Sequence, residues 1–200
     1  MAGFRFHTIG TEGRSDFRDR GSKFFGYAYP VDTPDDCKLR LQALKKEHPK
    51  ASHFCFAWRI GPDGEQHRVS DDGEPSGSAG KPIEGQLLSN GLTNAMVVVV
   101  RYFGGSLLGV PGLINAYKTA AAEALVQCSV VEKNVEVMVP VRFDYTVMNE
   151  VMMVIREFQI RVHQQDQGLF CSYTLAIPLE HKAAAIFKLQ QIRGLEYLSS

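Results

Sequence analysis

The sequence has no long hydrophobic run. Its longest uninterrupted apolar stretch covers residues 95–100, whereas a helix that crosses a bilayer needs about 20 apolar residues. The first ten residues are interrupted by Arg5 and His7 and contain no apolar segment of the kind a secretory signal requires. We therefore expect a cytoplasmic protein that does not interact with a membrane.

The chain also lacks an excess of either charge. Its 200 residues carry 22 Lys and Arg against 22 Asp and Glu. A protein that coats nucleic acid non-specifically usually has a basic face and a pI above about 9, so any contact with nucleic acid must use a local patch. The cysteines form no C-x-x-C pair, which indicates free thiols in a reducing compartment. They are Cys37, Cys55, Cys128 and Cys171.

Several motifs of known chemistry are absent. The chain contains no H-E-x-x-H and no G-x-G-x-x-G, and Pro75 and Pro82 occupy two positions that a P-loop requires. Neither Ser78 nor Ser106 has the two flanking glycines of a nucleophile elbow. The six histidines show no metal-ligand spacing. We expect no metal, no cofactor and no assigned catalytic residue.

Hydrophobic periodicity, by contrast, is clear. In residues 134–200, period-two alternation predicts strands at 135–143, 160–162 and 169–177, with a last strand at 197–198. Helical spacing predicts helices at 148–158 and 183–190. Pro140 lacks a backbone donor, so 135–143 is predicted to be an edge strand. The β-α-β-β-α-β order predicts a C-terminal ferredoxin-like domain.

Residues 1–133 are predicted to form a separate mixed domain, which makes the whole chain α+β. Strands are expected at 24–31, 52–60, around 69 and at 96–103, the last one central because both its faces are apolar. Helices are expected from Thr33 as N-cap, at 81–90 and at 112–128. Phe54, Phe56 and Trp58 are predicted to form a core face. The charged segment 5–23 is interpreted as solvated, and 129–134 as a short connection.

Glycine is concentrated in two segments that precede predicted helices, residues 70–81 and 101–109. Glycines allow close backbone approach, and a helix N-terminus offers free N–H groups and partial positive charge. The pattern predicts one cleft for an anionic ligand, with charge from Lys81 and Arg101. The alternative is that both segments are tight structural turns. The candidate ligand-binding residues are Asp71, Asp72, Gly73, Glu74, Ser76, Gly77, Ser78, Gly80, Lys81, Arg101, Tyr102, Gly104, Gly105 and His53.

Two enzymatic alternatives are weaker. His53 and Cys55 share a strand face, but neighbours on one face lie about 7 Å apart, which disfavours a direct Cys–His pair. Asp71, Asp72 and Glu74 could hold a hard cation, and with His53 they would suit a hydrolase. The same acids could instead cap helix and turn N–H groups.

A family resemblance rests on these segments. D-D-G-E-P-S-G-S-A-G-K-P-I at 71–83 and V-V-V-R-Y-F-G-G at 98–105 resemble the signature of the IMPACT family, in particular its bacterial YigZ-like members. The stretch from His48 to Trp58 and the pairs at 108–109, 112–113 and 116–117 are similar to the family pattern as well.

The resemblance implies a fold and a function class. It implies an N-terminal β-α-β sandwich like the second domain of a small-subunit ribosomal protein, and a C-terminal domain like the last one of elongation factor G. Because the eukaryotic relatives regulate translation, we expect a non-enzymatic translation- or stress-related regulator. Its partner would be RNA, the ribosome or a regulatory protein. A scaffold with purely structural loops is a further alternative.

Overall fold

A computed structural model describes residues 3–198 and divides into two compact units. One consists of residues 6–133, and the other of residues 134–198 with residues 3–5. The outer ends of the predicted domains, residues 1–2 and 199–200, lie outside the described residues. Among the described helices, none combines the length and apolar character that crossing a membrane requires.

The first unit is built on a five-stranded antiparallel sheet in the order β2-β3-β6-β4-β5. Its strands are β2 (Gly13–Asp19), β3 (Ser22–Pro30), β4 (His53–Ile60), β5 (Gln66–Ser70) and β6 (Ala95–Tyr102). The central position predicted for β6 is confirmed, because β3 and β4 pair with its two edges. The side chains of β6 are buried on both faces from Ala95 to Arg101.

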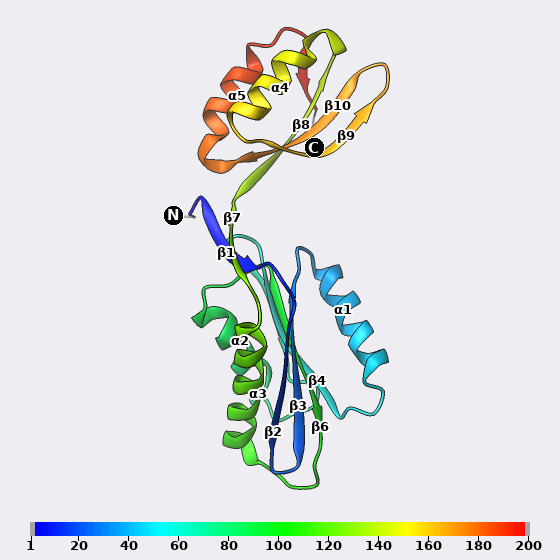
Figure 1. Ribbon diagram of the computed structural model, residues 1–200, viewed down its shortest axis with the longest axis vertical. Coiled ribbons are helices and arrows are strands. Elements are labelled where there is room, and N and C mark those ends of the chain that lie inside the picture. Colours follow the sequence, from blue (N-terminus) through cyan, green and yellow to red (C-terminus); the bar gives the residue numbers. More distant parts are fainter. Residues whose placement is uncertain (1–2, 199–200) are drawn as a thin grey trace. The chain divides into compact units, whose positions relative to one another are not determined.

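Three helices cover the two faces of this sheet. Helices α2 (Gly80–Ser89) and α3 (Gly109–Val126) lie on one face, and α1 (Pro34–Glu47) lies on the other (Figure 1). The predicted N-cap of α1 is confirmed: the Thr33 hydroxyl accepts the Asp36 N–H, and the Asp36 carboxylate accepts the Thr33 N–H. The sheet therefore has two separate cores.

Three strands were not predicted from the sequence. The segment read as solvated contains β1 (Arg5–Ile9) and β2, and the predicted connection is β7 (Val130–Asn134), which pairs with β1. In β2 the inward residues include Gly13 and Ser15, because α3 approaches closely and the Ser15 hydroxyl donates to the Ala120 carbonyl. Small residues at these positions hide the apolar alternation that would have indicated a strand.

Strand β4 is buried on both faces, although only one face was predicted to be core. Phe54 and Phe56 pack on the α1 side, whereas Cys55 and Ala57 are fully buried on the side of α2 and α3. Cysteine and alanine are small enough to fit beneath α2, so their burial produces no bulky apolar alternation.

The second unit confirms the predicted order of strands and helices and the α+β class. Its elements are β8 (Glu136–Phe143), η1 (Tyr145–Val147), α4 (Met148–Glu157), β9 (Arg161–Gln167), β10 (Cys171–Pro178), η2 (Leu179–His181), α5 (Lys182–Gln190) and β11 (Leu195–Tyr197). The sheet order is β11-β8-β10-β9. The edge position predicted for β8 is wrong, because β11 pairs with Val141–Phe143. Pro140 is tolerated because it lies just beyond this pairing, where its carbonyl accepts the Leu198 N–H.

Candidate functional site

The carboxylate of Asp71 holds loop residues 71–80 together. Its Oδ1 accepts hydrogen bonds from the backbone N–H groups of Ala79 (3.0 Å) and Gly80 (2.8 Å), and its Oδ2 accepts one from Gly77 (2.8 Å). These donors lie at and before the start of α2, where the N-cap Ala79 supplies no side-chain acceptor. The expectation that they bind an external anion is therefore wrong, because the chain's own carboxylate occupies them.

A second carboxylate lies where the two glycine-rich segments meet. Glu74 Oε1 accepts hydrogen bonds from Arg101 Nη1 (2.5 Å) and from the Tyr117 hydroxyl (2.7 Å). Only 4% of the Glu74 side chain and 5% of the Arg101 side chain are exposed. The guanidinium also lies over the Phe24 ring, and its Nη2 donates to Ser22 Oγ at 3.4 Å. Arg101 therefore neutralises an internal charge, and its predicted role of supplying charge to a ligand is wrong.

His53 and Cys55 fasten the same loop to β4. His53 Nδ1 donates to the Asp72 carbonyl oxygen (2.8 Å), and Cys55 Sγ donates to the Asp71 carbonyl oxygen (3.0 Å). His53 Nε2 lies 3.8 Å from Glu74 Oε1, which is too long for a hydrogen bond. Burial raises the pKa of the Cys55 thiol well above its ordinary range, so the thiol stays protonated. Each side chain bonds to the loop backbone, which argues against a Cys–His pair.

The three acids considered as metal ligands are engaged separately. Asp72 Oδ2 accepts the Phe54 N–H at 2.7 Å, while Asp71 caps the loop amides and Glu74 pairs with Arg101. Within residues 3–198, no group of three His, Cys, Asp or Glu side chains is placed to hold a metal ion. For Asp71 the contacts match the capping alternative, whereas Asp72 accepts an N–H group of strand β4 and not one of a helix or turn.

The second glycine-rich segment packs against the turn between β2 and β3. The Gly104 N–H donates to Ser22 Oγ (3.1 Å), and a Cβ on Gly104 would collide with the backbone of Gly21 and Ser22. Gly105 has a φ of +86° and open space around it. Gly104 is thus required by close approach, and Gly105 by its left-handed backbone.

Tyr102 does not join this cluster. Successive residues of a strand point to opposite faces, and Tyr102 lies on the α1 side of β6, with its hydroxyl 2.9 Å from His48 Nδ1. Its ring meets that of Phe25 edge-on. The prediction that Tyr102 and Arg101 line one site is therefore wrong.

The remaining predicted residues differ in exposure. Ser78 is buried, and its hydroxyl donates to the Pro75 carbonyl at 2.6 Å. Gly73 has a φ of +89°, and the loop's turns require it. Ser76 and Lys81 are exposed. Of the hydroxyl and cationic side chains predicted in residues 71–81, these two remain accessible to a partner.

Exposed apolar side chains that were not predicted as site residues adjoin the second glycine-rich segment. Leu107 is 84% exposed and Phe103 50% exposed. Val110 and Ile114 follow one helical turn apart at the start of α3, and both are exposed. We call these four side chains the loop surface. Its signal in the sequence is the presence of large apolar residues within a glycine-rich loop.

Comparisons with known proteins agree with the signature described above. The model of the Impact N-terminal domain matches residues 20–125. The IMPACT family member YvyE of Bacillus subtilis is 33% identical over 171 residues, covering 84% of this chain and 79% of the relative. YigZ of Escherichia coli is 33% identical over 159 residues, covering 78% of each.

A solved structure described as a hypothetical protein also matches almost the entire chain. It is 29% identical, has a TM-score of 0.77, and covers 99% of this chain and 98% of its own. The similarity therefore extends through both units, whereas the domain model lies inside the first. The chain belongs to the IMPACT family.

Proposed function

We propose that the protein is a non-enzymatic, cytoplasmic regulator of translation or of a stress response, and that it binds the ribosome through its loop surface. The family resemblance supports the regulatory role. The exposed Leu107 and Phe103 support the place of contact, because the nearby charged groups are bonded within the chain. Because these charged groups are bonded internally, we propose an apolar contact surface in place of the anion cleft predicted from the sequence.

The loop surface is presented on a rigid base. The Gly104 N–H donates a hydrogen bond to Ser22 Oγ. The ion pair between Glu74 and Arg101, which belongs to the same strand end, is buried. A preorganised surface loses less conformational entropy on binding than a flexible one does. Aromatic side chains, the type of Phe103, are also enriched at protein interfaces, and contiguous exposed apolar surface marks interaction sites.

Ribosome co-sedimentation tests the proposal. We expect the wild type to pellet with ribosomes and Leu107→Asp to bind at least about tenfold more weakly, because a charge replaces an apolar anchor. Val126→Asp is the matched control, since Val126 is 78% exposed at the far end of α3. Wild-type protein that stays in the supernatant, or equal binding by both variants, would contradict the proposal.

An RNA contact is the narrower form of the proposal. Lys81 is the exposed cation of the first loop, so Lys81→Ala should weaken binding to short RNAs and lower its salt dependence. Salt-independent ribosome binding would favour a protein contact instead. The hydrolase alternative has no observation in its favour, because its acids are already bonded to backbone N–H groups or to Arg101.

A further inference from the structure

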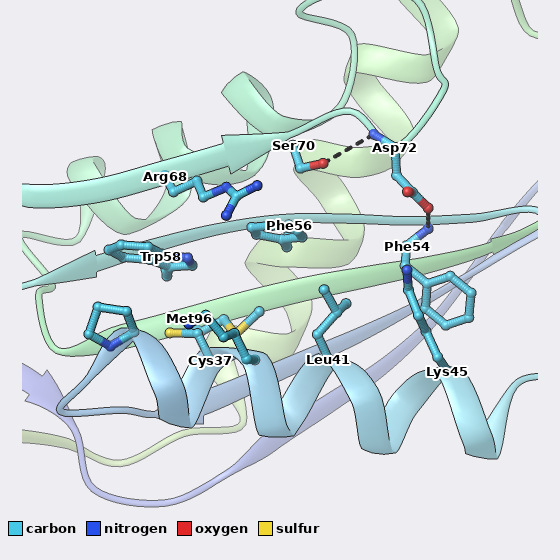
Figure 2. Close-up of a pocket in the computed structure, with 12 residues that line it drawn as sticks. Cys37, Leu41, Lys45, Phe54, Phe56, Trp58, Arg68, Ser70, Asp72 and Met96 are labelled. Atoms are coloured by element: carbon cyan, nitrogen blue, oxygen red, sulfur yellow. Dashed lines mark hydrogen bonds between the residues drawn. The ribbon is translucent and has the colours of Figure 1, made fainter.

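A groove lies on the face of the sheet opposite the Glu74–Arg101 pair, between α1 and the strands β4 and β5. Figure 2 shows its floor of Phe56 and Trp58, with Arg68 reaching over it from β5 and Leu41 facing it from α1. Its volume is about 260 Å³. This is slightly below the range of about 300–1,000 Å³ typical of small-molecule sites, so it suits a small ligand or one group of a larger ligand.

The groove follows from the local sequence. Period-two alternation places Phe54, Phe56 and Trp58 on one face of β4, and the register places Arg68 directly across from Trp58. Helix α1 presents Leu41 and Lys45, one turn apart, to the same face. Because β5 is the edge strand of the sheet, the groove opens to solvent beside it.

Two cations at the groove have no internal partner. Across residues 3–198, neither Lys45 nor Arg68 has an acidic group within ion-pair distance, whereas Lys38 pairs with Asp35 at 2.8 Å. Both unpaired cations lie over aromatic rings: Lys45 Nζ is 5.6 Å from the centre of Phe54, and the Arg68 guanidinium is 5.9 Å from that of Phe56. The groove therefore combines aromatic walls with two cations that form no ion pair within residues 3–198, and a single carboxylate, that of Asp72, lines it with them.

We propose that this groove binds a nucleotide, with its base inserted between α1 and Arg68 and its phosphate held by Arg68 and Lys45. A planar aromatic group bearing a negative charge matches both properties of the groove. Aromatic and guanidinium faces stack on bases, and cations bind phosphate. Asp72 adds a polar contact: its Oδ2 accepts the Phe54 N–H, and its other oxygen can accept from a sugar hydroxyl or a base amino group.

The nucleotide could be a free mononucleotide or one residue of a single strand, and both share this chemistry. The proposal is independent of ribosome binding, because Leu107 and Phe103 do not line the groove. A failure of one proposal therefore leaves the other intact.

Fluorescence of Trp58 provides a direct test, because Trp58 is the only tryptophan of the chain. AMP, a ten-residue adenylate strand, inorganic phosphate and benzoate would each be titrated up to about 1 mM, with affinities checked by calorimetry. We expect saturable quenching by AMP or by the strand. Arg68→Gln and Lys45→Gln should each weaken binding about tenfold or more, since each removes a charge-assisted contact.

Lys46→Gln is the matched control, because Lys46 is an exposed lysine of the same helix that does not line the groove. Binding of AMP supports a free nucleotide, and binding of the strand alone supports a single-stranded source. Three results overturn the proposal: no saturable response, phosphate or benzoate binding as tightly as the nucleotides, or equal losses in all three variants. Circular dichroism of each variant separates lost binding from lost folding.

Discussion

At the scale of single residues, Asp71 caps the N-terminus of helix α2 although the two are well separated in the sequence. It precedes α2 by nine positions, yet it accepts the first N–H groups of that helix together with that of Gly77. Burial on its own raises the pKa of Asp71, but the hydrogen bonds from Gly77, Gly80 and Ala79 and the charge of Lys81 outweigh it. The pKa therefore lies below the ordinary value of 3.8.

This lowered pKa predicts an acid-dependent loss of stability. A carboxylate whose pKa is lower in the folded than in the unfolded state stabilises the fold fully above the unfolded value, and this contribution is lost as pH falls through the folded value. At pH 7 we expect Asp71→Asn to lower the free energy of unfolding by about 1–3 kcal/mol, because loop N–H groups lose an acceptor. The difference from wild type should shrink below about pH 4.

Urea unfolding followed at Trp58 between about pH 7 and pH 2.5 measures this difference. Asp63→Asn is the control, since Asp63 is exposed and its side chain has no hydrogen bond among those described. A gap between wild type and Asp71→Asn that stays constant over the whole pH range would contradict the prediction.

Residue types alone could not separate ligand groups from structural ones. The sequence predicted Asp71, Glu74 and Arg101 in one anion cleft, and the structure joins Glu74 to Arg101 while Asp71 bonds within its own loop. The sequence could not show that Glu74 points inward, because that depends on Tyr117, which lies 43 positions away. A buried carboxylate and a buried guanidinium can pair with each other. In the sequence alone, such an internal pair has the same residue pattern as a site that binds an external anion.

At the scale of elements, the packing of α2 against β5 determines where the first loop can lie. Gly80 is the first residue of α2 and lies against the backbone of Ser70. A Cβ at Gly80 would lie 2.9 Å from the Ser70 nitrogen and 3.0 Å from its carbonyl oxygen. Since the β4–β5 pairing holds Ser70 opposite Phe56, neither backbone can move without loss of contacts.

This contact predicts opposite effects for two glycines of one helix. Gly80→Ala should lower the free energy of unfolding by about 1–3 kcal/mol through overpacking. Gly85→Ala, with no atom within 4 Å of its added Cβ, should raise it by about 0.5–1 kcal/mol because alanine is the better helix former. Urea unfolding of both variants measures the two changes. If the two variants had equal free energies of unfolding, the close contact between Gly80 and Ser70 would not constrain α2, and the prediction would be wrong.

Elements with strong periodicity were predictable and edge elements were not. Helix α3 was expected with Leu113, Ala116 and Tyr117 inward, and all three are buried. Strand β7 was missed because four of its five residues are exposed and only Val130 and Val131 are apolar, and its pairing with β1 depends on a segment about 125 positions away. Such pairing leaves little local signal, since an edge strand needs few apolar residues.

At the scale of the whole molecule, each of the two units has buried hydrophobic clusters of its own among the residues that the structure describes. The two clusters of the first unit contain residues from Ile9 to Cys128, and the cluster of the second contains residues from Val137 to Leu195. Each unit thus has a core of its own, which is the property that allows independent folding. From the change in periodicity after residue 134, the sequence predicted domains at 1–133 and 134–200, whereas residues 3–5 group with the second unit.

Separate cores predict separate unfolding transitions. Leu175 is fully buried in the second unit, so Leu175→Ala should destabilise that unit by about 2–5 kcal/mol. Trp58 belongs to the first unit, so its fluorescence midpoint in urea should not change, while the far-ultraviolet circular dichroism separates into two steps. Val99→Ala, which truncates a fully buried side chain of the first unit, is the reciprocal control and should lower the Trp58 midpoint. If Leu175→Ala shifts the Trp58 midpoint as well, the two units unfold as one cooperative structure, because a single transition couples every probe.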